Sequence, residues 1–220
     1  MNEASLNRLS QIVWPALAET FFMVFVTVLF SVIIGIFIAI VLYMTSPNGL
    51  KPAKNLNRAI SFLVNVFRSF PFIILSVAII PFTRIVVGTA IGNVAALVPL
   101  IISSSAFSTR IFESALREVD FKLVEAVKSF GSTDFQVLRD VVFVEARPAI
   151  VSGLTVVIIQ ALNMSAVAGA VGAGGLGSAA IMYGYQSFNN TIMYGIVIIL
   201  IVIVQLIQMA GNLFYNSIKK

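Results

Sequence analysis

Long runs of apolar residues alternate with short polar segments along the chain. The run 20–44 carries no charged residue, and about 20 apolar residues are enough for a helix to cross a bilayer. The run 70–83 is too short to cross alone, so the second span is expected to begin near residue 59 and to hold Arg68 inside it. The pattern predicts five transmembrane helices, at residues 20–44, 59–83, 89–107, 148–168 and 191–215.

The basic residues between these runs indicate how the chain is oriented. Segments 45–58, 109–147 and 216–220 together hold eleven of the fourteen Lys and Arg residues. Cytoplasmic loops carry an excess of Lys and Arg, so we expect these segments in the cytoplasm, which places the N-terminus outside and the C-terminus inside. Arg8 and Arg84 then lie outside.

Composition excludes several classes of protein. Apolar residues make up 59% of the chain and charged residues 10%, against roughly 45–50% and 25% in soluble domains. We therefore expect a single all-α polytopic membrane domain over residues 1–220. The absence of Cys and His excludes disulfides, thiolate metal sites, haem ligation through His, and Cys/His or Ser/His catalysis. No metal or cofactor is expected, and the net charge of +5 is explained by topology rather than by nucleic-acid binding.

The charged segment 109–147 is expected to be a water-exposed loop that contains two short helices. Glu125 lies on the polar face of the first helix, Gly131 is placed to end it in the left-handed conformation, and Thr133 with Gln136 forms a capping box that opens the second. The apolar face of the first helix has the spacing i, i+3, i+4 and i+7, at Leu123, Ala126, Val127 and Phe130.

Two interpretations of this helix pair are open: a solvated connector between spans, or a docking element. An apolar stripe that faces water favours docking, because it needs a surface to cover it. The chain also lacks the G-x-x-x-x-G-K-[S/T] loop that cradles ATP phosphates. Energy for uphill transport would therefore have to come from a partner.

The same segment resembles a known motif. Glu125-Ala126-Val127, with Gly131 four residues beyond and a basic and apolar run to Pro148, is similar to the EAA loop of binding-protein-dependent ABC importer permeases. The resemblance implies that the first helix docks in a groove of a separate ATPase. That family usually has alanine where Val127 stands and proline where Val144 stands, and both departures keep the apolar character. The implied ATPase-coupling residues are Leu123, Glu125, Ala126, Val127, Phe130 and Gly131.

A wider resemblance covers nearly the whole chain. Segments 68–72 (RSFPF), 145–148 (EARP), 168–177 (AGAVGAGGLG) and 183–186 (YGYQ) are similar to those of the methionine importer permease subfamily. The resemblance implies a homodimer of this chain in the bacterial cytoplasmic membrane, two copies of an ABC ATPase subunit, and an extracytoplasmic methionine-binding protein, commonly a lipoprotein.

Small residues after the fourth span have two open interpretations, as a close-packed turn or as a gating hinge. The G-x-G-x-x-G match at 172–177 is read as accidental, because no strand precedes it and no βαβ unit surrounds it. The residues of this hinge or packing group are Gly169, Gly172, Gly174, Gly175 and Gly177.

Four residues are candidates for a substrate pathway. Arg68 should avoid lipid, since an Arg at a helix centre costs about 2.5–3.5 kcal/mol on insertion scales; snorkelling of its side chain to the cytoplasmic face is the alternative. Asn163, Met164 and Ser165 place an amide, a thioether and a hydroxyl together in the fourth span. They suit a zwitterion with an apolar side chain, although a Met in a span more often serves packing.

The sequence thus favours the permease subunit of an ATP-driven importer, most simply for methionine, working by alternating access and having no catalytic activity of its own. An importer of another small solute is the nearest alternative, because the binding protein largely selects the substrate. A membrane enzyme such as an intramembrane protease is disfavoured: the chain has no His, and the predicted spans contain no Asp or Glu. A simple channel or scaffold would not need the capped helix pair.

Overall fold

The computed structural model describes residues 3–219, and every regular element in that range is a helix, which confirms the predicted all-α fold. Lys220 lies outside the described residues, and so does the side chain of Arg8. The elements are α1 (Glu3–Thr45), α2 (Lys54–Ser69), α3 (Phe72–Ala78), α4 (Ile80–Val87), α5 (Asn93–Arg117), α6 (Phe121–Ser129), α7 (Asp134–Gln136), the π-helical η1 (Val137–Val142), α8 (Phe143–Ala170), α9 (Gly175–Ala179), the π-helical η2 (Ala180–Tyr185) and α10 (Asn190–Ile218).

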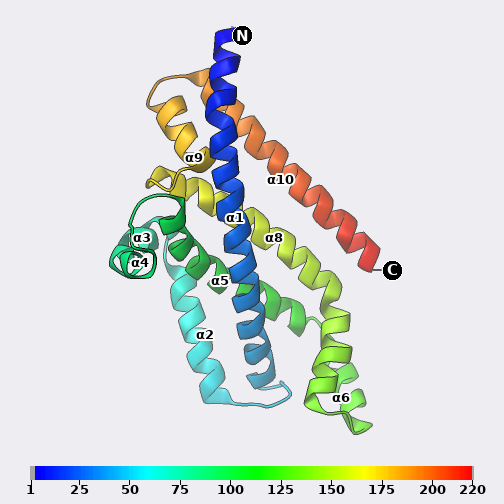
Figure 1. Ribbon diagram of the computed structural model, residues 1–220. Coiled ribbons are helices and arrows are strands. Elements are labelled where there is room, and N and C mark those ends of the chain that lie inside the picture. The colour runs from blue at the N-terminus through cyan, green and yellow to red at the C-terminus, as the bar shows by residue number, and fades with distance from the viewer. Residues whose placement is uncertain (1–2, 220) are drawn as a thin grey trace.

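Helix α1 is the axis around which the other helices gather (Figure 1). Its 43 residues make a helix about 65 Å long at 1.5 Å per residue. The loop 46–53 that follows it lies at the bottom of Figure 1, close to α6, whereas the N-terminus and α9 lie towards the top. We call these two ends of the molecule the α6 end and the α9 end.

Four helical segments of the described chain are long and apolar enough to cross a membrane, and a fifth span results if α2 and α3 are counted as one bent span. The axes of α2 and α3 differ in direction by 100°. The bend falls at Phe70 and Pro71: proline disfavours helical geometry in the residue before it, and Phe70 is accordingly extended, with φ −74° and ψ 127°. The continuous helix expected over 59–83 is therefore broken.

Helix α5 also differs from the expectation. The span predicted at 89–107 continues to the end of α5, so residues 109–117 are helical rather than part of a water-exposed loop. Phe112 and Glu113 on this stretch are buried. The charge pattern was misleading here because the charged side chains pair with one another along the helix.

A second long helix joins the predicted loop to the fourth span. Residues 134–170 form one helical segment, in which α7, η1 and α8 follow each other without a break. The second loop helix and the span expected at 148–168 are thus a single element. The π-helical turn η1, a local widening of the helix, lies within the predicted loop, before the expected start of the span.

Hydrophobic core clusters hold the helices together towards both ends of the molecule. At the α6 end, residues from α1, α5, α6, η1 and α8 pack together, among them Ala39, Phe112, Val124, Val142 and Val157. Towards the α9 end, α1, α5, α8 and the turn after α8 meet through Met23, Leu100, Met164, Ala168 and Ala173. Burial of such side chains contributes about 25 cal/mol per Å² of apolar surface where water is the alternative, which applies most directly at the α6 end.

Candidate functional site

Helix α6 and the turn after it are defined by local backbone contacts. The Asp120 carboxylate accepts the Lys122 backbone N–H at 2.9 Å and caps the first turn. Gly131 has φ +86°, which confirms the predicted left-handed ending. The capping box is also confirmed: the Gln136 N–H donates to Thr133 Oγ1 at 3.3 Å, and the Thr133 N–H donates to Gln136 Oε1 at 2.9 Å.

Val124 attaches α6 to the rest of the protein. Its side chain is buried and packs in the cluster that contains Leu116 of α5 and Val137 and Val142 of η1. A helix of nine residues is too short to be stable in isolation, so this attachment holds it in place. Sequence reasoning missed Val124, although its position, one residue from the predicted stripe, marks a second apolar face.

The predicted coupling residues lie mostly on the surface of the chain. Leu123, Glu125, Ala126 and Phe130 are exposed, and Phe130 is 89% exposed. Val127 differs from the prediction, because it is partly buried against the core cluster of the α6 end. The outward apolar surface is therefore formed by Leu123, Ala126 and Phe130.

The surroundings of this surface combine apolar and acidic groups. Phe121 and Phe135 are also exposed, so aromatic side chains extend the apolar area. Beside α6 lies a cleft of about 430 Å³, and no basic side chain lines it. Its lining includes Leu123 and the carboxylates of Glu118, Asp120 and Glu145.

An ion cluster ties the turn after α6 to the loop 46–53. The Asp134 carboxylate lies 3.0 Å from Lys128 Nζ and 3.9 Å from Lys51 Nζ. Lys128 Nζ also donates to the carbonyl oxygen of Leu50 at 3.4 Å. The end of α6, the start of α7 and the segment after α1 are thereby held together.

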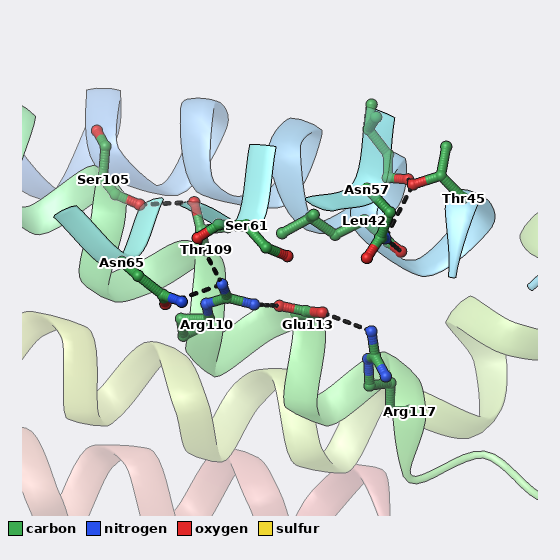
Figure 2. Close-up of polar contacts among 11 residues, drawn as sticks. Leu42, Thr45, Asn57, Ser61, Asn65, Ser105, Thr109, Arg110, Glu113 and Arg117 are labelled. Carbon is green, nitrogen blue, oxygen red and sulfur yellow. Dashed lines mark hydrogen bonds and ion pairs between the residues drawn. The ribbon is translucent and has the colours of Figure 1, made fainter. Parts of the chain in front are cut away.

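A buried charge network joins α5 to α2 (Figure 2). Glu113 is 4% exposed and pairs with Arg110 at 2.5 Å and with Arg117 at 2.8 Å. Arg110 also donates to the Ser61 carbonyl oxygen at 3.0 Å and to Asn65 Oδ1 at 2.9 Å. Sequence reasoning missed this network, although opposite charges at i, i+3 and i, i+4 signal it.

Arg68 lies in the last turn of α2, immediately before the break at Pro71. The expected span is bent rather than continuous, because α2 ends one residue after Arg68; the Arg68 side chain is exposed on the chain surface. Within residues 10–219, its guanidinium makes no ion pair or hydrogen bond.

The three polar candidates of the fourth span do not share one surface. Met164 and Ser165 are buried; Met164 packs in the cluster near the α9 end, and the Ser165 hydroxyl donates to the Leu162 carbonyl oxygen at 2.7 Å. Asn163 alone is exposed. Helical geometry explains the difference, since consecutive residues point in directions about 100° apart.

The glycine segment packs tightly against its neighbours. A Cβ on Gly177 would collide with the carbonyl oxygen of Ala166, and one on Gly169 with the backbone nitrogen of Ser178. Glycine is thus required where the backbones of α8 and α9 touch. The turn between them needs left-handed backbone, with φ of +93°, +85° and +73° at Gly172, Gly174 and Gly175.

Polar side chains of α1 cap the helix that begins at this turn. The Gly175 N–H donates to Glu19 Oε2 at 2.6 Å, and the Leu176 N–H donates to Thr20 Oγ1 at 2.8 Å. A carboxylate at a helix N-terminus satisfies free N–H groups and is stabilised by the helix dipole. Sequence reasoning missed this contact because 156 residues separate its partners.

Comparison with known proteins agrees with this geometry. The family model for the binding-protein-dependent transport system inner membrane component matches residues 31–220. The probable D-methionine transport system permease protein MetI of Vibrio cholerae is 43% identical over 203 residues, which are 92% of this chain and 90% of that protein. The methionine import system permease protein MetP of Bacillus subtilis is 42% identical over 179 residues, 81% of each chain.

Solved structures lead to the same family. A chain of the inward-facing MetNI methionine ABC transporter superposes with a TM-score of 0.92 and 41% identity, covering 100% of both chains. A chain of an amino acid ABC transporter with histidines shares the fold, with a TM-score of 0.81 at 23% identity. By the family match and by relatives this similar over most of their length, the chain belongs to the inner-membrane components of binding-protein-dependent transport systems, the multi-pass permease subunits of ABC importers.

Proposed function

We propose that this protein is the permease subunit of an ATP-driven methionine importer, and that α6 couples it to a separate ATPase. The observation that carries the proposal is the capped helix α6, which presents Leu123, Ala126 and Phe130 outward while Val124 anchors it in the core. The MetI and MetP relatives, which are named for methionine transport, support the choice of substrate. The functional assembly is then a homodimer of this chain with two ATPase subunits and an extracytoplasmic methionine-binding protein.

The packing around α6 suits it to transmit a displacement. Val124 is embedded among residues of α1, α5, η1 and α8, and Asp134 ties the following turn to the loop 46–53 through Lys128 and Lys51. Close-packed interiors transmit strain rather than absorb it. A movement of the ATPase surface under α6 would therefore shift the spanning helices and alternate access between the two sides.

The acidic cleft beside α6 suits a basic partner surface. Glu118, Asp120 and Glu145 line the cleft. Glu125 is exposed on α6 itself. A charge-assisted hydrogen bond to a partner contributes about 1.5–3 kcal/mol. The Lys and Arg distribution supports an orientation with this α6 end in the cytoplasm, where an ATPase would have access to ATP.

The test compares two single substitutions on α6 with a control on α2. Leu123→Ala trims the outward apolar surface, Glu125→Ala removes the carboxylate, and Lys54→Ala alters an exposed charge at the start of α2 as the control. All three should reach the membrane at the parental level, because exposed sites contribute little to folding. In vesicles with the ATPase and the binding protein, the first two should reduce stimulated ATP hydrolysis and methionine uptake about tenfold, while the control keeps both. Parental rates in both test variants would make α6 only a connector.

A separate measurement identifies the substrate. The binding protein is purified with its bound ligand, and uptake of labelled L- and D-methionine is compared with uptake of another small amino acid. Methionine in the binding protein together with saturable methionine uptake supports the proposal. A different ligand would leave the importer assignment in place and replace methionine.

A further inference from the structure

Helix α2 has two chemically different faces. Asn57, Ser61, Asn65 and Arg68 recur at i, i+4, i+8 and i+11, which places them on one side of the helix. The adjacent side carries apolar residues that line a groove of about 560 Å³ with α1 and α5. The α2 residues of that groove are Ile60, Leu63, Val64 and Phe67.

The first part of the polar face is bonded inside the chain. The Asn57 side-chain amide donates to the Leu42 carbonyl oxygen at 2.8 Å and to Thr45 Oγ1 at 3.0 Å. Arg110 of α5 holds Ser61 and Asn65 through the bonds seen in Figure 2. These contacts hold the first part of the polar face against α1 and α5 and fix the rotation of α2 about its axis.

The last part of the polar face has no such partners. Arg68 is exposed and unpaired among residues 10–219, and the neighbouring Ser69 is exposed with its hydroxyl bonded only to the Asn65 carbonyl oxygen of its own helix, at 2.7 Å. A guanidinium with this freedom keeps its full charge and its five N–H donors for a ligand.

The helices packed beside α2 indicate that Arg68 lies within the membrane-spanning part of the protein. The groove on the other face of α2 is completed by Ile34 to Val41 of α1 and Ile101 to Ala106 of α5, and both helices are long and apolar enough to cross the membrane. Arg68 is also ten residues, about 15 Å, along the helix from Arg58. An Arg at such a depth is costly against lipid and faces protein or a water-filled cavity.

We propose that the face of α2 formed by Ser61, Asn65, Arg68 and Ser69 is part of the wall of the translocation pathway, and that Arg68 binds the carboxylate of the passing solute. The inference rests on the proposed import function and adds the chemical group that the pathway recognises. Guanidinium and carboxylate form paired hydrogen bonds of matching geometry. Water at the site weakens the pair, as at protein surfaces, so the solute is held briefly and released.

Cysteine labelling tests the position of this face in the assembled transporter, because the parental chain has no Cys. Ser61→Cys and Ser69→Cys place a thiol on the polar face, and Leu63→Cys places one on the apolar face as the matched control. Water-soluble thiol reagents that carry a sulfonate or an ammonium group should modify the first two and leave the third unreacted. Labelling of Leu63→Cys as fast as Ser69→Cys would overturn the proposal.

The charge of the reagent tests Arg68 itself. At Ser69→Cys the anionic reagent should react about threefold to tenfold faster than the cationic one, because the adjacent guanidinium attracts one and repels the other. Adding Arg68→Gln should bring the ratio close to one, whereas Arg68→Lys should keep it. A ratio that Arg68→Gln leaves unchanged would remove Arg68 from the pathway.

Transport supplies an independent readout. Methionine imported per ATP hydrolysed should fall about tenfold in Arg68→Gln and less in Arg68→Lys, while Leu63→Cys stays at the parental ratio. A parental ratio in Arg68→Gln would refute the carboxylate-binding role. If the parental transporter fails to import methionine, the proposed substrate is wrong, and the two labelling results still decide whether the polar face of α2 lines a positively charged aqueous path.

Discussion

Removing the buried carboxylate of Glu113 should destabilise the contact between α5 and α2. Glu113→Gln keeps the shape of the side chain and one carbonyl acceptor, so it leaves no cavity, but it removes the charge that two guanidinium groups share. Arg110 retains its bonds to Ser61 and Asn65. The substitution therefore isolates the electrostatic part of the network.

The burial of the two partners sets the magnitude. A hydrogen bond to a charged group contributes about 1.5–3 kcal/mol, and the bond to Arg110, whose side chain is 20% exposed, belongs in this range. The Arg117 side chain is 48% exposed, so its pair is closer to a surface salt bridge, at about 0–1 kcal/mol. The total loss is about 1.5–4 kcal/mol, which corresponds to a fall of about 3–16 °C in Tm at 2–4 °C per kcal/mol for a chain of this size.

Thermal unfolding of the purified permease in detergent measures this loss. Glu118→Gln is the control, because Glu118 is exposed at the end of the same helix, and it should shift Tm by less than about 2 °C. Arg117→Gln should cost less than Arg110→Gln, since only Arg110 reaches α2. A Tm for Glu113→Gln within 2 °C of the parental value, or equal losses for the two arginines, would refute the reasoning.

Three further predictions concern the turns and the orientation. Gly131→Val should strain the left-handed turn by about 1–2 kcal/mol and reduce the ATPase subunit retained on purification, whereas Gly131→Asn, which tolerates φ +86°, should retain it. Gly177→Ala should lower Tm by several degrees because its Cβ meets the Ala166 carbonyl oxygen, and Ser178→Ala should leave Tm unchanged. Lys128→Cys should resist a membrane-impermeant thiol reagent in intact cells and react after lysis; labelling in intact cells would reverse the orientation.

The predictions of helix caps and turns, which depend only on residues close together in the sequence, are confirmed. Gly131 and the Thr133–Gln136 capping box are confirmed, because caps and turns are set by residues close together in the chain. The family and the all-α fold follow from hydrophobic runs and short motifs of the same local kind.

The errors arose where distant contacts decide the structure. Charge density placed 109–117 in a loop, yet Glu113 is buried there because two arginines neutralise it. The length of the hydrophobic run predicted one continuous helix through Pro71. Proline restricts the residue before it, however, and the chain bends there by 100°. The capping of Gly175 by Glu19 has no local signal at all, since its partners meet only in the folded chain.

The continuous helical segment 134–170 runs from the α6 end of the molecule towards the α9 end. Its 37 residues span about 55 Å at 1.5 Å per residue, from the turn after α6 to the glycine turn that Glu19 caps. Of the two interpretations of the glycine turn, the backbone contacts favour close packing over a gating hinge. The backbones of α8 and α9 touch directly at Gly169 and Gly177, and a hinge motion there would have to separate them. The irregular part of the segment is η1, at the α6 end, where a π-helical turn changes the local geometry of the helix. Adjustment during coupling is therefore expected next to the proposed ATPase contact, while α8 and α9 move as one body.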